Sequence, residues 1–386
     1  MLSSQSDDDL AAATSSSTAR RTSHSLAASA ITDVGGIESG AVRTSSNLDL
    51  RLLSRSRAEA EGSPPLGLVA RPLGQPLDEK ELADVRARDL IGTSTRVAAF
   101  EQLKDPGQRA EGRRRLSAWL VVEARTRDEI ESRIRSNADG TRATLVSILA
   151  SDGTSESQRR LGKLLAAGPA ESELVLRYLH LVKEPLDDWF DWLRPLAEKG
   201  ESTTEARLAY GYVLGRSLHT TSPKVAPARS WLLQRLEAAS GPSKTSFIDA
   251  LGNSGDPAAL PTLARLIESK DPELAASSLR AARRIPGAKA DRIVSERFDD
   301  PRLVVRRSAV FAASYRELPN FRTEITTALR TEQDGDVRRE VVGLLLRLAD
   351  SDKTARTELA AIARGDRDPI TRKRAADWLA SREAKL

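Results

Sequence analysis

The chain has 386 residues, enough for two or three domains or for one elongated repeat array, and 39% of them are hydrophobic but only 4% aromatic. The absence of cysteine excludes disulfides, thiolate metal sites and cysteine nucleophiles, and the 3 histidines disfavour a multi-histidine metal site. The 60 basic and 55 acidic residues are interspersed and leave a formal charge of +5, so the charge does not indicate nucleic acid as a partner.

The first 80 residues differ from the rest of the chain. They are rich in Ser, Thr, Gly and Pro and have too few clustered apolar residues to offset the entropy of ordering, so residues 1–80 are predicted to be a disordered N-terminal segment. Residues 47–53 alternate partially and could form a lone strand without a partner. With no long apolar run and no signal peptide, the chain as written is predicted to be cytoplasmic; a true start upstream with a signal peptide would make it exported.

Residues 81–386 show a steady rhythm of helix starts, apolar seams and short turns, without convincing strand alternation. Thr126 and Glu129 have the spacing of a capping box, and Pro185 stands just before another predicted helix start. In the helix predicted near residues 337–348, five apolar residues fall on one face, which must be buried against a neighbour: Val337, Val341, Leu344, Leu345 and Leu348.

A repeat is clearest in the last third of the chain. Asp271-Pro272, Asp300-Pro301, Asp334-Gly335 and Asp368-Pro369 recur at intervals of 29, 34 and 34 residues, each predicted to open a helix. A basic residue follows the last three of these caps, at Arg306, Arg338 and Arg372. This pattern resembles the Asp-Pro-x-Val-Arg-x-x-Ala signature of HEAT repeats, and the unit at Asp271 departs from it because it lacks the arginine.

A second resemblance spans about residues 140–345. The segments 149–154, 183–185, 250–257 and 282–285 resemble, in order and spacing, the helical domain of the vitellogenin family of large lipid transfer proteins. In that family the helical domain lies beside lipid-cavity β-sheets and follows a β-barrel, neither of which is expected here, so the resemblance implies fold more strongly than lipid transport. The segment around Gly252 is predicted to be a helix-to-helix corner, with Gly252 in a left-handed cap.

Two local features could carry chemistry. Asp187 and Asp188 could act in acid–base catalysis beside Trp189 and Trp192, which could stack on a ligand. A structural role is favoured instead: the two aspartates lie in the first turn of a helix, and Trp189, Trp192 and Leu193 share its buried face. His180 could be a general base, but a half-buried structural histidine is favoured, because no nucleophile is linked to it in the sequence.

Small and basic residues give three further candidates. The Gly211 and Gly215 spacing would suggest helix dimerisation in a membrane, but close packing within the array is favoured because the segment is too polar. The runs 113–115 and 372–374 are basic and could contact phosphates, but a solvated helix face is favoured. No phosphate-binding loop or nucleophile elbow occurs in the sequence.

The sequence thus predicts an all-α fold, an α-superhelix (solenoid) of HEAT-like antiparallel helix pairs over residues 81–386. The predicted function is a non-enzymatic protein-interaction scaffold whose partner is another protein. The alternative is a lipid-binding or lipid-transfer module, and an enzyme is the least favoured class. No catalytic, cofactor-binding or metal residue and no cofactor is predicted; nucleic acid is disfavoured as a partner, and no membrane span is expected.

Overall fold

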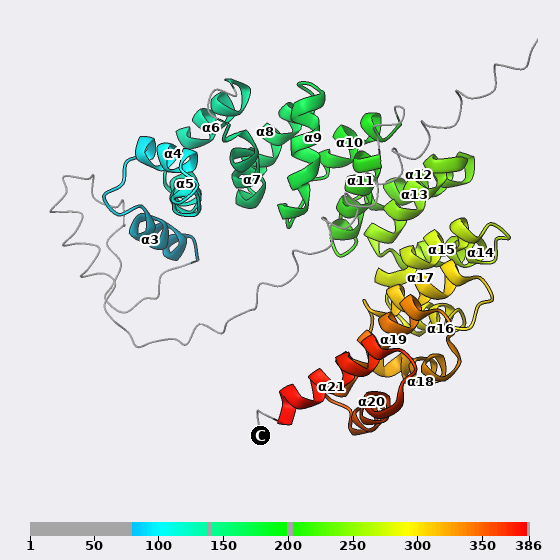
Figure 1. Ribbon diagram of the computed structural model, residues 1–386. Helices are drawn as coiled ribbons and strands as arrows, with labels where there is room; N and C mark the ends of the chain where they lie inside the picture. The colour runs from blue at the N-terminus through cyan, green and yellow to red at the C-terminus, as the bar shows by residue number, and fades with distance from the viewer. Residues whose placement is uncertain (1–78, 137–139, 199–203, 384–386) are drawn as a thin grey trace, which may run out of the picture. The chain divides into compact units, whose positions relative to one another are not determined.

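The computed structural model describes residues 79–136, 140–198 and 204–383, and within them every regular element is a helix. The all-α solenoid prediction is confirmed: helices follow one another in chain order, each packed on its neighbours (Figure 1). The predicted disordered segment 1–80 lies outside the described residues except for Glu79 and Lys80, which open the first helix. The strand candidate at residues 47–53 lies wholly outside them.

The odd-numbered helices from α5 onward contact each other in sequence and form what we call the first row. These helices are α5 (Arg109–Val122), α7 (Arg142–Asp152), α9 (Pro169–Tyr178), α11 (Thr204–Ser217), α13 (Gly241–Ser254), α15 (Pro272–Ala281), α17 (Leu303–Ala313), α19 (Gly335–Ala349) and α21 (Pro369–Glu383). At the N-terminal end of the row, α3 (Glu79–Ile91) and α4 (Arg96–Lys104) pack on α5.

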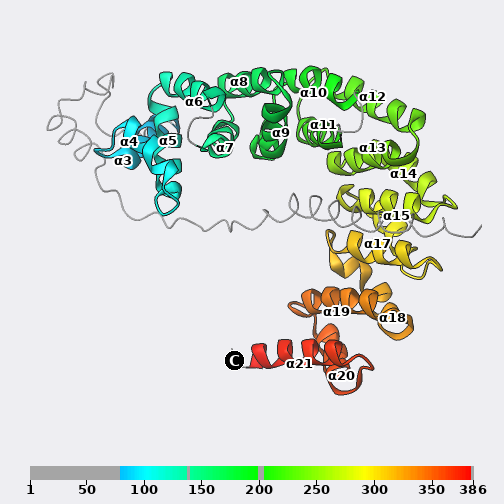
Figure 2. The same ribbon diagram turned by 45° about the horizontal axis from the view of Figure 1, so that its top comes forward.

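The even-numbered helices from α6 onward form the second row, and each contacts a first-row neighbour in the chain. They are α6 (Arg125–Ser136), α8 (Ser155–Leu165), α10 (Asp188–Glu198), α12 (Val225–Ala238), α14 (Leu260–Ile267), α16 (Ala288–Ser295), α18 (Arg322–Thr331) and α20 (Lys353–Gly365). Figure 2 shows α6, α8, α10 and α12 in one line with α7, α9, α11 and α13 in the line beside it. Short 3₁₀ turns join some pairs: η1 (Leu179–Leu181), η3 (Pro257–Ala259), η4 (Ala282–Arg284) and η5 (Leu318–Phe321).

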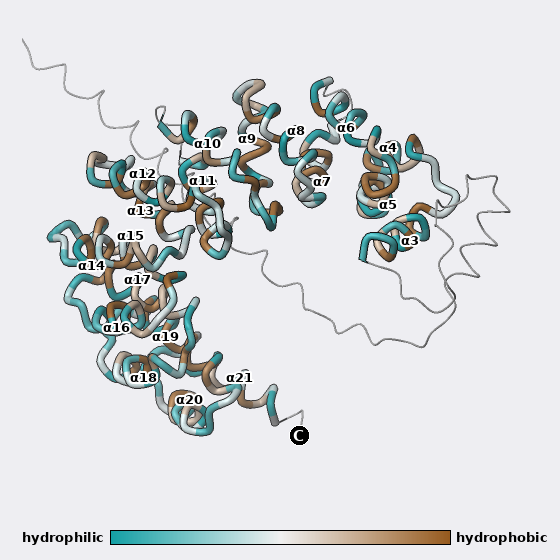
Figure 3. The backbone as a smooth tube through the Cα atoms, turned by 180° about the vertical axis from the view of Figure 1, so that it is seen from behind, coloured by the Kyte–Doolittle hydropathy of each residue, from teal (hydrophilic) through white to brown (hydrophobic). Residues whose placement is uncertain are grey.

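The apolar core follows the seams between helices and is not gathered in one central block. Buried apolar side chains form one large cluster that runs from α4 to α16 and a second that runs from α14 to α21. Figure 3 shows apolar residues recurring on helix after helix. The predicted seam of α19 is confirmed, since all five of its apolar residues are buried. Each repeat therefore buries its apolar face on the next one.

Acidic N-caps begin several helices as predicted. The Asp271 carboxylate accepts hydrogen bonds from the N–H groups of Glu273 and Leu274, and Asp334 does the same at the start of α19. Asp368 accepts from the N–H of Ile370 in the first turn of α21. These carboxylates satisfy N–H groups that have no partner within the helix and complement its dipole.

Three helix starts differ from the prediction. Thr126 is no cap, because α6 begins at Arg125 and the Thr126 hydroxyl donates to the carbonyl oxygen of Trp119 at 3.4 Å. The helix after Asp300 begins only at Leu303, because that carboxylate binds the Arg302 side chain and N–H. After Pro185, α10 begins at Asp188.

Glycines let the helices of the first row touch at the backbone. A Cβ on Gly211 would overlap the carbonyl oxygen of Ala250, and one on Gly215 would lie 2.6 Å from that of Ser254. Both contacts join α11 to α13, so the predicted close packing at this glycine pair is present. Side chains larger than hydrogen at these positions would force the two backbones apart.

The predicted left-handed cap at Gly252 is wrong. Gly252 lies inside α13, where a Cβ would stand 2.7 Å from the Cα of Ala281. The left-handed cap is Gly255, with φ of 60°. Gly252 is therefore required for close approach of α13 to α15, and Gly255 for the reversal of the chain.

Charged side chains join successive repeats. Arg306 of α17 pairs with Glu332 at 2.8 Å, and Arg338 of α19 pairs with Asp366. Burial of the Asp366 carboxyl opposes its ionisation, but the Arg338 guanidinium and the N–H of Asp368 together hold its pKa below the ordinary value. Two of the three arginines of the predicted signature thus reach a carboxylate in the following repeat, while Arg372 donates to the carbonyl oxygen of Asp366.

Gly211→Ala should loosen the contact of α11 with α13 and lower local stability by about 1–3 kcal/mol, because the added methyl overlaps Ala250. Hydrogen exchange of the amides in both helices measures this loss. Gly343→Ala in α19 is the control: its Cβ would meet only the end of the Arg374 side chain at 3.5 Å, so a gain of about 0.5–1 kcal/mol is expected. Equal effects of the two substitutions would contradict backbone contact at Gly211.

Arg338→Ala should destabilise the last repeats by about 3–5 kcal/mol, because it leaves the Asp366 carboxylate buried without its cation. Lys373→Ala removes an exposed pair with Asp377 in the same part of the chain and should change stability by at most about 0.5 kcal/mol. Urea denaturation of both variants tests the contrast. A loss for Arg338→Ala no larger than for the control would show that the pair is not buried.

Acid should remove the contribution of Asp366. The pKa of the Asp366 carboxyl is lower in the folded protein than in the unfolded chain, where it is about 3.9. The carboxyl therefore stabilises the fold fully at a pH above the unfolded-state pKa. This stabilisation is lost as the pH falls through the folded-state pKa. The stability difference between the protein and Asp366→Asn should therefore be constant from pH 7 to about pH 5 and shrink below about pH 4. A constant difference down to pH 2 in urea titrations would refute this linkage.

Candidate interaction surface

Helix α17 carries an apolar stripe on its exposed side. Leu303, Phe311 and Tyr315 are 45%, 36% and 42% exposed, although the opposite side of the helix is buried through Val305 and Ala309. The ring centroids of Phe311 and Tyr315 lie 5.1 Å apart and tilted by 56°. The described part of the chain exposes few other large apolar side chains, so this stripe is a feature to be explained by function.

A half-buried arginine lies beside the aromatic pair. The Arg283 guanidinium carbon is 5.8 Å from the centroid of the Tyr315 ring, within cation–π range. Its Nη2 donates to Oδ1 of Asn253 at 3.3 Å and its Nη1 to the carbonyl oxygen of Arg280 at 2.9 Å. Its Nε is buried and has no hydrogen-bond partner among the described residues. The hydrogen-bond acceptors of the Arg283 side chain are therefore both neutral.

The local charge around Arg283 is positive. Burial and the neighbouring Arg284 lower the pKa of Arg283, and Asp249 is the carboxylate that opposes them. Burial raises the pKa of Asp249, and Arg280 and Arg283 offset part of that effect. Within the described chain, the side chains of Asp249 and of the exposed Arg284 make no hydrogen bond or ion pair.

We call this surface the α17 face. It is defined by Asp249, Arg283, Arg284, Leu303, Phe311 and Tyr315, which come from α13, η4, α17 and the turn after α17. It continues toward α19, because Arg347 of that helix donates to the carbonyl oxygen of Ser314 at 2.6 Å. The face combines exposed rings with more positive than negative charge.

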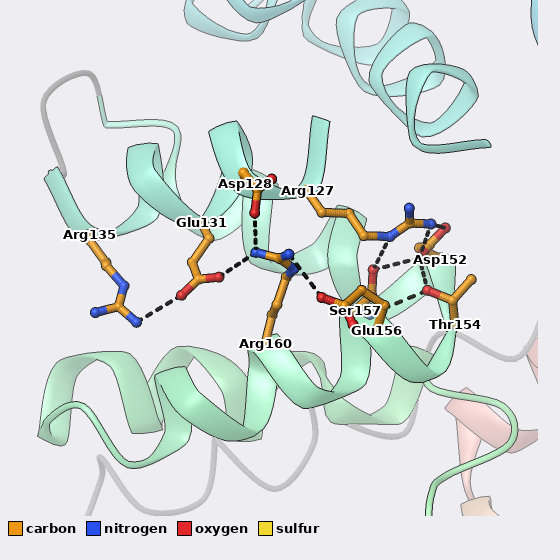
Figure 4. Close-up of polar contacts among 9 residues, drawn as sticks. All are labelled: Arg127, Asp128, Glu131, Arg135, Asp152, Thr154, Glu156, Ser157 and Arg160. Carbon is orange, nitrogen blue, oxygen red and sulfur yellow. Dashed lines mark hydrogen bonds and ion pairs between the residues drawn. The ribbon is translucent and has the colours of Figure 1, made fainter. Parts of the chain in front are cut away.

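A second charged cluster consists of ion pairs and hydrogen bonds within the chain. Between α6 and α8, Arg160 pairs with Asp128 at 2.8 Å and Glu131 at 2.7 Å (Figure 4). In the same view Arg127 pairs with Asp152 at 3.2 Å, and that carboxylate also accepts from Ser157. This network joins α6 to α7 and α8, and each of the three arginines drawn pairs with at least one carboxylate.

The tryptophan cluster is structural, as the favoured interpretation held. Trp189 is fully buried, packs edge-on against Trp192 at 5.0 Å, and donates from Nε1 to Oε1 of Gln158 at 2.8 Å. Leu193 is buried on the same face, whereas Trp192 is only partly buried. Asp188 begins α10, where its charge complements the helix dipole.

The half-buried histidine prediction is wrong. His180 lies in η1 with its side chain exposed, and its Nδ1 is 2.9 Å from the carbonyl oxygen of Arg177. The 3₁₀ turn that follows α9 rotates this residue away from the seam, and Leu179 takes the buried position.

The two basic runs make intramolecular contacts. Arg114 and Arg115 both pair with Glu111, and Arg374 donates to the carbonyl oxygen of Arg339 at 3.3 Å. These contacts agree with the favoured solvated-face interpretation of both runs.

Metal-ligand clusters and membrane-spanning helices are both absent from the described residues. No group of three or more His, Asp or Glu side chains there is arranged to hold a metal ion. None of the helices in that part of the chain is both long and apolar enough to cross a membrane.

Sequence reasoning missed the α17 face. The available signal was a second stripe on α17, since Leu303, Arg307, Phe311 and Tyr315 recur at every fourth residue beside the buried stripe. A helix with apolar residues on two faces buries one of them and presents the other. The contribution of Arg283 had no such signal, because it depends on which helices are neighbours.

The match to one protein family agrees with a helical repeat. Residues 229–314 match the family model described as HEAT repeats, and this range contains α13 to α17. A crystal structure of an engineered protein is 16% identical, covering 79% of this chain and 96% of that one, with a TM-score of 0.32. No curated protein matches. The comparisons do not support the resemblance to the vitellogenin family.

Proposed function

We propose that this chain is a non-enzymatic interaction scaffold that binds another protein through the α17 face. The observation that carries the proposal is the exposed Phe311–Tyr315 pair beside Arg283, on an array whose other apolar side chains are largely buried between helices. Aromatic and arginine side chains are enriched at the centres of protein interfaces, where they contribute most of the binding energy.

The repeat architecture supports the same function. Each helix pair is stabilised by its neighbours, so residues outside the seams are available for contact with a partner. Rings and arginines on neighbouring helices offer a preorganised surface, because α11, α13 and α15 are held by backbone contact at Gly211, Gly215 and Gly252 and α17 packs on α15.

No specific observation favours the lipid-binding alternative. The exposed large apolar residues of the described chain are distributed over α3, α4, α5, α17 and α21: Leu90, Val97, Val121, Leu303, Phe311, Tyr315 and Ile370. Three of them recur along α17 and the turn after it, and Arg283 lies beside Tyr315. This pattern suits a protein partner better than a lipid chain.

A photo-crosslinking amino acid at position 315 should capture a partner protein from an extract of the source cells, whereas the same amino acid at Thr327, an exposed position of the second-row helix α18, should not. Mass spectrometry identifies the partner, and titration of the purified pair gives the affinity. Phe311→Ala and Tyr315→Ala should each weaken binding by about tenfold or more.

Circular dichroism of both variants should match that of the unmodified protein, because the two rings are exposed. Binding through the α17 face would be refuted if crosslinking from position 315 gave the same products as crosslinking from position 327. It would also be refuted if neither substitution changed the affinity for the partner.

A further inference from the structure

The charge pattern of the α17 face identifies the kind of partner it fits. We propose that the face binds an acidic peptide segment of the partner, with carboxylates on Arg283 and Arg284 and an apolar side chain against Phe311 and Tyr315. This inference rests on the proposed function and names the partner class for the same surface.

Comparison with the next repeat shows what Arg283 lacks. Arg316 is 33 residues further along and pairs with Asp291, a carboxylate in the first turn of α16. The same guanidinium donates to the carbonyl oxygens of Ala282 at 3.0 Å and Ile285 at 2.7 Å, so its charge and its donors are both matched.

No carboxylate serves Arg283 in this way. Residues 257–262, which form η3 and open α14 in the preceding repeat, contain no acidic residue. Arg283 donates instead to the neutral side chain of Asn253 and to a backbone carbonyl oxygen, and its Nε stays without a partner in the described chain. The array thus ion-pairs the arginine at one repeat boundary, whereas at the adjacent one Asp249 acts on Arg283 without an ion pair between the two.

Arg284 adds a further positive charge at the same boundary. Its side chain is exposed and makes no hydrogen bond or ion pair with any described residue. A carboxylate arriving between Arg283 and Arg284 would supply the missing counter-charge, and charge-assisted hydrogen bonds to a carboxylate are among the strongest that arginine makes.

The negative groups on the same surface favour a peptide over nucleic acid. Asp249 lies among the arginines, and Glu340 of the adjacent helix α19 pairs with Arg307 on α17. A continuous phosphate backbone would meet both carboxylates, whereas an acidic peptide can place its few charges on Arg283 and Arg284 alone. The Leu303 to Tyr315 stripe then suits a leucine or aromatic residue of the peptide.

The test pans a display library of random peptides, each of about ten residues, against the full-length protein. At ~3.3 Å per residue, such a peptide can span two neighbouring repeats. The enriched sequences should carry several Asp or Glu and at least one leucine or aromatic residue. Failure to enrich any peptide, or enrichment of basic or uncharged sequences, overturns the proposal.

The enriched peptides are then measured by fluorescence anisotropy against matched variants. Arg284→Glu should weaken binding about tenfold or more, and Tyr315→Ala by a similar factor. Arg330→Glu changes an exposed arginine of α18 that likewise has no partner in the described chain, and should leave the affinity within about twofold. Replacing Asp and Glu of the peptide by Asn and Gln should abolish binding. Equal losses for Arg284→Glu and Arg330→Glu overturn the proposal.

A single-stranded RNA oligonucleotide serves as the competing probe. The RNA should not displace the peptide. If the RNA binds and Arg284→Glu abolishes that binding, the face would be assigned to nucleic acid instead. A protein crosslinked at position 315 through a segment without acidic residues would refute this inference and leave the proposed scaffold function standing. The absence of both a crosslinked partner and an enriched peptide would refute both.

Discussion

Backbone contact between neighbouring first-row helices is the constraint on which the rest of the array depends. Gly211 and Gly215 bring α11 against α13, and Gly252 brings α13 against α15. At such distances a methyl group would overlap a carbonyl oxygen or a Cα atom, so the spacing of α11, α13 and α15 is fixed by glycine and not by the size of the apolar side chains. The positions of the second-row helices follow, because each packs on first-row neighbours.

Once this spacing is set, long arginine side chains can reach from one repeat to the one before it. Arg216, Arg316 and Arg347 donate to the carbonyl oxygens of Lys183, Ala282 and Ser314, which lie 33, 34 and 33 residues earlier. These bonds add acceptor contacts to carbonyl groups at or near the ends of helices. Many of the 60 basic residues therefore act between repeats, where their charge is not available to an external ligand.

The α17 face differs from this regular pattern in two ways at once. Arg283 and Arg284 form no ion pair with a carboxylate of the described chain, as Arg316 does, and the rings of Phe311 and Tyr315 remain exposed where most other large apolar side chains enter a seam. Neither feature stabilises the array itself. The Arg284 charge, which has no ion pair, lies beside the half-buried Arg283 guanidinium, and the two rings expose apolar surface to water; both cost free energy. A bound partner would remove both costs, which is the physical basis of the proposed function.

The sequence by itself determined the helical class, the acidic caps at Asp271 and Asp334, the buried seam of α19 and the buried Trp189, because each depends on residues within about one helix of each other. Only the tertiary structure decided the role of Gly252, which local rules assign to a cap but which lies inside α13 against Ala281. It alone also revealed the candidate surface, because whether Arg283 meets a carboxylate depends on side chains about thirty residues away. Periodicity reports which face of a helix is apolar, but the distance between two helices, and hence which charges meet, is fixed only by their packing.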